Sequence, residues 1–259
     1  MIKKETDKFE TSDILEGMSS ISALFKGIEI GTNDRRVIKI LFDNSKIASK
    51  KRELGFLKAK SYQYGFEIEF VQTEDIEKLT VGNTHGGIVA LCTPRAIPFL
   101  NLENIAPDGC YFILEGVEDP YNFGYAVRSL FASGANGIIL GERNWMGAAG
   151  IVARSSAGAS ELMDMYVSEP TEAIKLFKEK GYSVVCAGIR DSVSIFETEL
   201  KKPLLVVLGG EKRGISRAVL DLADRVVRID YGNEFGGSLS TSAAASVFGF
   251  EVFRANLKK

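Results

Sequence analysis

The second half of the chain contains five short, largely apolar segments, and this feature most constrains the fold. They span residues 111–114, 137–140, 182–187, 204–208 and 225–229, and helix-like segments separate them. Strands that are buried on both faces lose the alternation of apolar and polar residues, which is typical of a parallel sheet covered by helices. We therefore expect an open α/β sheet of five or six strands. Ligands of such sheets bind in the loops that follow the carboxyl ends of the strands.

The first 95 residues alternate strand-like and helix-like segments. Strands are expected over 36–42, 66–71 and 87–92, and a long helix over 46–64. Ser12 and Asp13 predict the cap of an earlier helix that ends near Lys26, because their side chains accept hydrogen bonds from first-turn N–H groups.

Three prolines, Pro94, Pro98 and Pro107, interrupt regular structure after these segments. We therefore expect two domains: a smaller α/β domain over residues 1–100 and a parallel-sheet domain over 108–259.

The composition excludes several classes of protein and site. Three dispersed cysteines form no disulfide framework, which favours a reducing, cytoplasmic location. One histidine without cysteine pairs predicts no metal site. No apolar run approaches the ~20 residues that span a bilayer, so we expect no membrane partner.

Glycine, charge and hydroxyl groups gather in three loops that follow predicted strands. The loops span residues 116–128, 208–216 and 229–242. Neither a G-x-G-x-x-G fingerprint nor a G-x-S-x-G elbow is present, and Ile215 stands where a phosphate-binding loop needs lysine. His85 is the only imidazole, which argues against a Ser–His–Asp hydrolase.

In order, the three loops resemble the signature motifs of the SpoU (TrmH) class of the SPOUT superfamily. The motifs are matched by residues 118–124 with Arg128, by 208–215, and by 229–239 with the Ala-rich helix that follows; residues 155–159 are also similar to the family. Residues 1–95, which end in the stretch 85–88, resemble a ribosomal-protein-like RNA-binding domain that often precedes it. The resemblance implies RNA ribose 2′-O-methylation with S-adenosylmethionine, a C-terminal trefoil knot and a homodimer.

The resemblance also implies four catalytic residues. Arg128 corresponds to the catalytic arginine. Because a guanidinium stays protonated in proteins, we expect it to clamp a phosphate and stabilise oxyanion charge rather than act as a base. Asn122 is either a helix cap or an orienting hydrogen-bond partner, and Glu211 is either a solvated turn residue or part of the active site. Ser238 matches a motif serine that orients substrate or a loop.

Six residues match positions that hold the cofactor, mainly through backbone groups. They are Leu208, Gly209, Gly210, Ile229, Tyr231 and Leu239. The chain departs from the family at Ser240, where asparagine is usual, and at Asp230 and Tyr231, where Pro-Met is usual. These departures leave open a non-catalytic RNA-binding relative, and an α/β nucleotide enzyme with another cofactor is a further alternative.

The charge is distributed unevenly, although the formal total is only −2. Residues 46–60 carry six basic residues and one acidic residue, a local net charge of +5. Such a stretch suits phosphate contacts. We expect Lys50, Lys51, Arg52 and Arg154 to contact structured RNA. Ribosomal RNA is favoured because transfer RNA enzymes of the class often lack the preceding domain.

Overall fold

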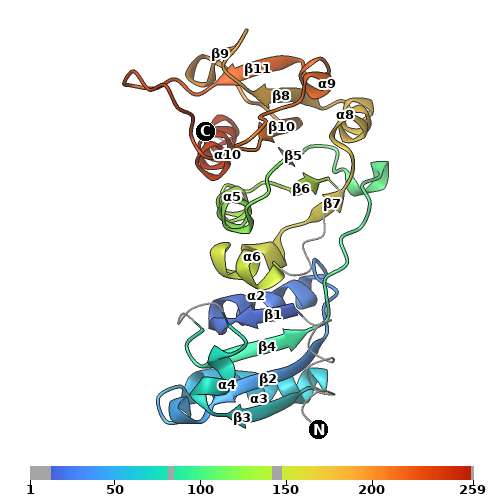
Figure 1. The fold of residues 1–259 in the computed structure, drawn as a ribbon. Coiled ribbons are helices and arrows are strands. Elements are labelled where there is room, and N and C mark those ends of the chain that lie inside the picture. Colours follow the sequence, from blue (N-terminus) through green and yellow to red (C-terminus); the bar gives the residue numbers. More distant parts are fainter. Residues whose placement is uncertain (1–12, 81–84, 142–147, 258–259) are drawn as a thin grey trace. The chain divides into compact units, whose positions relative to one another are not determined.

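A computed structural model describes residues 13–80, 85–141 and 148–257, which form two compact units. The first unit contains residues up to Ala96 together with the helices α6 (Ala149–Ser155) and α7 (Ala159–Leu162); the second contains the rest (Figure 1). No helix among the described residues is long and apolar enough to cross a membrane.

The first unit is built on a mixed four-stranded sheet in the order β1-β4-β2-β3. Its strands are β1 (Asp13–Glu16), β2 (Val37–Asp43), β3 (Glu67–Val71) and β4 (Ile88–Cys92), and its helices are α2 (Gly17–Ile30), α3 (Lys51–Tyr64), the short α4 (Thr73–Glu77) and the 3₁₀ turn Asn44–Lys46. β4 pairs antiparallel with β1 and β2, whereas β2 and β3 are parallel. Apolar side chains of α2 and α3, including Phe25 and Leu57, form the core with the sheet.

Two helix starts differ from the sequence prediction. Asp13 lies in β1, where its residue pairs with Cys92 of β4, and the helix begins at Gly17 instead. The predicted helix 46–64 begins only at Lys51, because Asn44–Lys46 forms a separate 3₁₀ turn capped by Asp43. Lys46 and Lys50 therefore do not extend a basic face of α3.

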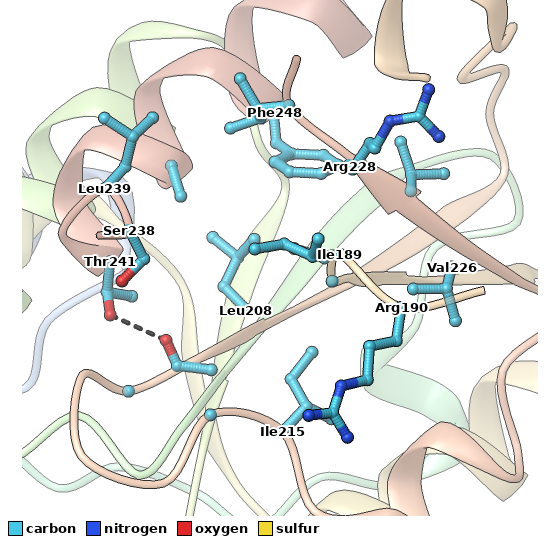
Figure 2. A pocket seen from close by; sticks show the side chains of 18 of the residues that line it. Ile189, Arg190, Leu208, Ile215, Val226, Arg228, Ser238, Leu239, Thr241 and Phe248 are labelled. Atoms are coloured by element: carbon cyan, nitrogen blue, oxygen red, sulfur yellow. Dashed lines mark hydrogen bonds between the residues drawn. The ribbon is translucent and has the colours of Figure 1, made fainter. Parts of the chain in front are cut away.

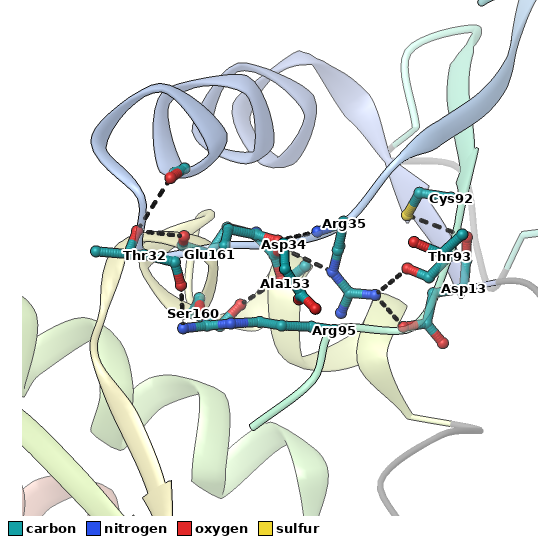
Figure 3. Close-up of polar contacts among 12 residues, drawn as sticks. Asp13, Thr32, Asp34, Arg35, Cys92, Thr93, Arg95, Ala153, Ser160 and Glu161 are labelled. Carbon is teal, nitrogen blue, oxygen red and sulfur yellow. Dashed lines mark hydrogen bonds and ion pairs between the residues drawn. The ribbon is translucent and has the colours of Figure 1, made fainter. Parts of the chain in front are cut away.

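Buried charges attach α7 to the first unit (Figure 3). Arg35 pairs with Asp13 of β1 and, through Nε at 2.9 Å, with Glu161 of α7, and all three residues are buried. Asn33 also donates to the Glu161 carboxylate. Burial raises the pKa of the Asp13 carboxyl, against the opposing effect of Arg35. These ions are worth burying only because they are paired and hydrogen-bonded.

Glycines let the same helices approach the first unit closely. An added Cβ on Gly27 of α2 would collide with the Glu161 carbonyl oxygen, and one on Gly150 of α6 would collide with that of Ile14. A Cβ on Gly158 would come within 2.5 Å of Ala23 Cβ. Residues that follow the first loop motif in sequence thus pack with the N-terminal unit, unlike the predicted continuous domain over 108–259.

The second unit confirms the predicted parallel sheet. Seven strands run in the order β7-β6-β5-β10-β8-β11-β9, and each pairing is parallel. The strands are β5 (Cys110–Glu115), β6 (Gly137–Leu140), β7 (Met165–Val167), β8 (Ser183–Ala187), β9 (Val193–Ser194), β10 (Leu204–Gly209) and β11 (Arg225–Arg228). The sequence analysis missed β7 and β9, which are only three and two residues long.

Helices cover this sheet. They are α5 (Pro120–Ala132), α8 (Pro170–Glu179), α9 (Arg217–Leu220) and α10 (Thr241–Ala255), with 3₁₀ turns at Leu102–Asn104 and Ile195–Glu197. Ile174 and Phe177 of α8 pack with Ile113 and Val207 in the main core. α10 lies along α5 and also contacts β10 (Figure 1). The trefoil knot stays a prediction from the resemblance.

Candidate active site

Four neighbouring strands of the second unit, β5, β10, β8 and β11, end at one edge of the sheet. Because they are parallel, the loops after their carboxyl ends lie together. A cavity of about 390 Å³ lies there, bounded by the loops after β8, β10 and β11 and by α10 (Figure 2). The volume is within the range of small-molecule sites, roughly 300–1,000 Å³.

The loop after β10 is a tight turn that only glycine permits. An added Cβ on Gly209 would lie 2.5 Å from the Gly214 carbonyl carbon and 2.7 Å from Ile215 N. A Cβ on Gly210 would overlap the carbonyl oxygen of Gly116, which follows β5. Gly214, with φ of 63°, donates its N–H to Gly210 O at 3.0 Å. The backbone of this turn is thus open to a ligand on the cavity side.

The start of α10 joins this turn to the third loop. Thr241 Oγ1 donates to Gly209 O at 2.8 Å, and Thr241 N donates to Glu211 Oε1 at 3.3 Å (Figure 2). Ser240 is the N-cap, and its Oγ accepts the N–H of Ala243 at 3.2 Å. Serine is among the preferred N-cap residues, so Ser240 has a defined structural task here.

The loop after β11 is held by side chains. Asp230 accepts hydrogen bonds from Ser194 Oγ and, at 2.7 Å, from Arg228 Nε. These donors, Ser194 first, lower the pKa of the Asp230 carboxyl. Tyr231 OH accepts the N–H of Leu239 at 3.2 Å, which closes the far end of the loop. The charge of Asp230 is therefore neutralised by Arg228, and Asp230 does not line the cavity.

The predicted residues divide into two groups. All six residues predicted to hold the cofactor line the cavity, and so do Glu211 and Ser238. Arg128 and Asn122 lie on α5 and do not line it. Asp119 caps α5, and Asn122 Oδ1 accepts a weak hydrogen bond from Ser242 Oγ at 3.5 Å. Arg128 is exposed, and among the described residues it has no hydrogen-bond partner.

The sequence analysis missed the loop after β8. Gly188, Ile189 and Arg190 line the cavity, as do Ile215, Thr241 and Phe248. The available signal was position, since the predicted strand over 182–187 ends directly before Gly188. The loop lacked the concentration of glycine and hydroxyl groups that marked the other three.

The residues predicted to contact RNA lie in the first unit. Lys51 and Arg52 are exposed in the first turn of α3, and Lys50 is its N-cap residue. A Cβ added to Gly86 would lie 3.0 Å from Lys50 Nζ, so that ammonium lies close to the 85–87 turn. Arg154 on α6 pairs with Glu16 at 3.0 Å.

Lys60, also in the basic stretch, has a structural role. It pairs with Glu29, and its ammonium lies within 6 Å of the ring centres of Phe25, Phe56 and Tyr64.

Comparison with known families agrees with both units. Residues 109–250, more than half of the chain, match the SpoU rRNA methylase family. The chain belongs to this family. Residues 14–98 match the substrate-binding domain of RNA 2′-O ribose methyltransferases. The predictions of the family, of an RNA 2′-O-ribose methyltransferase and of a preceding RNA-binding domain are confirmed.

Several relatives extend this SpoU assignment. A tRNA/rRNA methyltransferase of the TrmH family from Staphylococcus saprophyticus is 35% identical over 55% of this chain and 57% of its own length, so that alignment spans just over half of each. The 23S rRNA (guanosine-2′-O-)-methyltransferase RlmB of Shewanella oneidensis is 25% identical over 93% of this chain and 97% of its own. An AdoMet-bound rRNA methyltransferase from Sinorhizobium meliloti has the same fold, with a TM-score of 0.78 and 22% identity over 99% and 92% of the two chains.

Proposed function

We propose that this chain transfers a methyl group from S-adenosylmethionine to a ribose 2′-hydroxyl of ribosomal RNA. The observation that carries the proposal is the cavity in which the second and third motif loops meet, tied by the Thr241 hydrogen bonds to Gly209 and Glu211. The names of the Shewanella and Sinorhizobium relatives support the RNA class and the cofactor.

The cavity suits that cofactor in its donors and its walls. Leu208, Ile215, Val226 and Phe248 provide apolar surface for a nucleoside, and the 209–214 turn offers backbone groups. When bound, S-adenosylmethionine supplies a methyl group that the sulfonium charge already activates, so the residues need only hold, orient and accept a proton. Orientation of this kind can supply about 7–11 kcal/mol.

Arg128 is proposed to hold the phosphate beside the target ribose and to stabilise negative charge on the attacking oxygen. Asn122 is proposed to orient the ribose. Among the described residues its side chain contacts Ser242 and not Arg128, which favours this role over positioning Arg128. Glu211 and Ser238 line the cavity and are proposed to position the ribose and the loop.

The test separates chemistry from cofactor binding. Arg128→Ala should abolish methyl transfer to ribosomal RNA while the calorimetric affinity for S-adenosylmethionine stays within about twofold, because Arg128 does not line the cavity. Near-normal turnover would refute the role of Arg128. A wild-type chain that binds no S-adenosylmethionine at millimolar concentration would support a non-catalytic RNA-binding relative instead.

The RNA is proposed to bind the first unit at Lys50, Lys51 and Arg52. These side chains gather at the start of α3, where exposed N–H groups add positive potential. Arg154 contributes less in this proposal because Glu16 already pairs with it. Lys51→Ala with Arg52→Ala should weaken RNA binding and flatten its salt dependence by about two counterions. An unchanged salt slope would contradict this surface.

A homodimer through α5 and α10 is proposed from their exposed apolar side chains. Tyr121 and Tyr125 share one face of α5 with Arg128, and Phe250 and Phe253 are each 49% exposed on neighbouring α10. Apolar patches of this kind mark interfaces. Sedimentation velocity should show a dimer that Phe250→Glu with Phe253→Glu converts to monomer; a wild-type monomer would refute the interface.

A further inference from the structure

The turn after β8 is built to hold one conformation. Asp191 has φ of 50°, a left-handed conformation that non-glycine residues rarely adopt. Ser192 Oγ donates to Ile189 O at 2.6 Å, and Arg228 Nη1 donates to Ser192 O at 2.7 Å. Gly188 N donates to Val227 O at 3.0 Å. Backbone strain of this kind persists where surrounding contacts over-determine it, and it gathers at ligand-binding sites.

This turn carries Arg190 into the cavity wall. Three charged side chains line the cavity: Glu211, Arg228 and Arg190. Arg228 is neutralised by Asp230, and Glu211 accepts the Thr241 N–H. Arg190 has no hydrogen-bond or ion-pair partner among the described residues, and Figure 2 shows its side chain extending along the wall on the same side as Ile215. One guanidinium is therefore available to a ligand.

The charges of the cofactor decide which group this guanidinium can meet. S-adenosylmethionine carries a positive sulfonium, a positive ammonium and one negative carboxylate. A guanidinium repels the first two groups and pairs with a carboxylate through two parallel hydrogen bonds. We infer that Arg190 binds the carboxylate of the cofactor and thereby selects the complete amino-acid end. This inference rests on the proposed function.

The test compares two ligands that differ only in this group. Decarboxylated S-adenosylmethionine keeps the adenosine, the sulfonium and the ammonium but lacks the carboxylate. Isothermal calorimetry would give the Kd of both ligands for the wild type, Arg190→Ala and Arg190→Lys. Arg217→Ala is the matched control, because Arg217 is an exposed arginine of the same unit that pairs with Asp221 and does not line the cavity.

We expect the wild type to prefer S-adenosylmethionine over the decarboxylated ligand by about 10-fold or more, the usual size of a charged hydrogen-bonded contact. Arg190→Ala should abolish this preference, Arg190→Lys should keep part of it, and Arg217→Ala should keep all of it. Equal loss of affinity for both ligands would overturn the inference and assign Arg190 to the adenosine, and an unchanged preference would exclude cofactor contact. A wild type that binds neither ligand would instead refute the proposed function.

Discussion

The two units use charge in opposite ways. In the first unit Arg35, Asp13 and Glu161 are buried together and satisfy one another. In the second unit the charged residues around the cavity, Glu211 and Arg190, are exposed on loops, and Arg128 is exposed on α5. The buried charges are already committed to partners, so they hold elements of the fold. The exposed charges remain available to ligands.

The comparison also separates two kinds of close approach by glycine. In the first unit glycines such as Gly27 allow helices to meet each other or a strand, whereas in the second unit Gly209 and Gly210 allow one loop backbone to meet another. The former contacts fix α6 and α7 in the first unit. The latter shape the wall of a cavity.

The largest expected effect comes from breaking the buried ion cluster. Arg35→Met leaves Asp13 and Glu161 buried without their cation, and loss of one partner of a buried pair costs about 3–5 kcal/mol. Urea unfolding should show this loss of unfolding free energy. Lys39→Met is the control, since Lys39 pairs with Glu67 and Glu69 at a more exposed site and should lose at most about 1 kcal/mol. Equal losses in both variants would contradict the contrast between buried and exposed charge.

An intermediate effect is expected from filling the turn after β10. Gly209→Ala places a Cβ against the backbone of Gly214 and Ile215, which must shift, and overpacking of this kind costs about 1–3 kcal/mol. Because the turn lines the cavity, the Kd for S-adenosylmethionine should rise along with the loss of stability. Gly232→Ala, where nothing lies within 4 Å of an added Cβ, should change neither. Unaltered cofactor affinity in Gly209→Ala would show that the turn does not shape the site.

The smallest effect concerns an exposed carboxylate. Asp224 accepts hydrogen bonds from Val184 N and Lys178, at 2.7 and 2.6 Å, and although burial opposes it, these bonds lower the pKa of the Asp224 carboxyl. A depressed folded-state pKa stabilises the fold above the unfolded value, near 3.8, and this stabilisation is lost as the pH falls through the folded value. Asp224→Asn should therefore cost about 1 kcal/mol or less at pH 7 and still less below pH 4. A cost that is independent of pH would exclude the ionised carboxylate as its source.

The sequence predicted much of the second unit because its information is local. The apolar runs marked β5, β6, β8, β10 and β11, since burial on both faces leaves a pattern within each strand. The three motif loops were found for the same reason. Strands as short as β9 leave no such pattern, and the false helix start at Asp13 arose because a residue that can cap a helix is also one that can pair with a buried arginine.

The sequence by itself determined the family, the parallel sheet and the residues of the second and third motif loops. The tertiary structure decided that the loop after β8 joins them, because the strand order places β8 between β10 and β11. It also decided that Asp230 is neutralised by Arg228 and that α6 and α7 pack with the first unit. These outcomes depend on hydrogen bonds and ion pairs between residues far apart in the chain, such as Arg35 and Glu161, which no local pattern records.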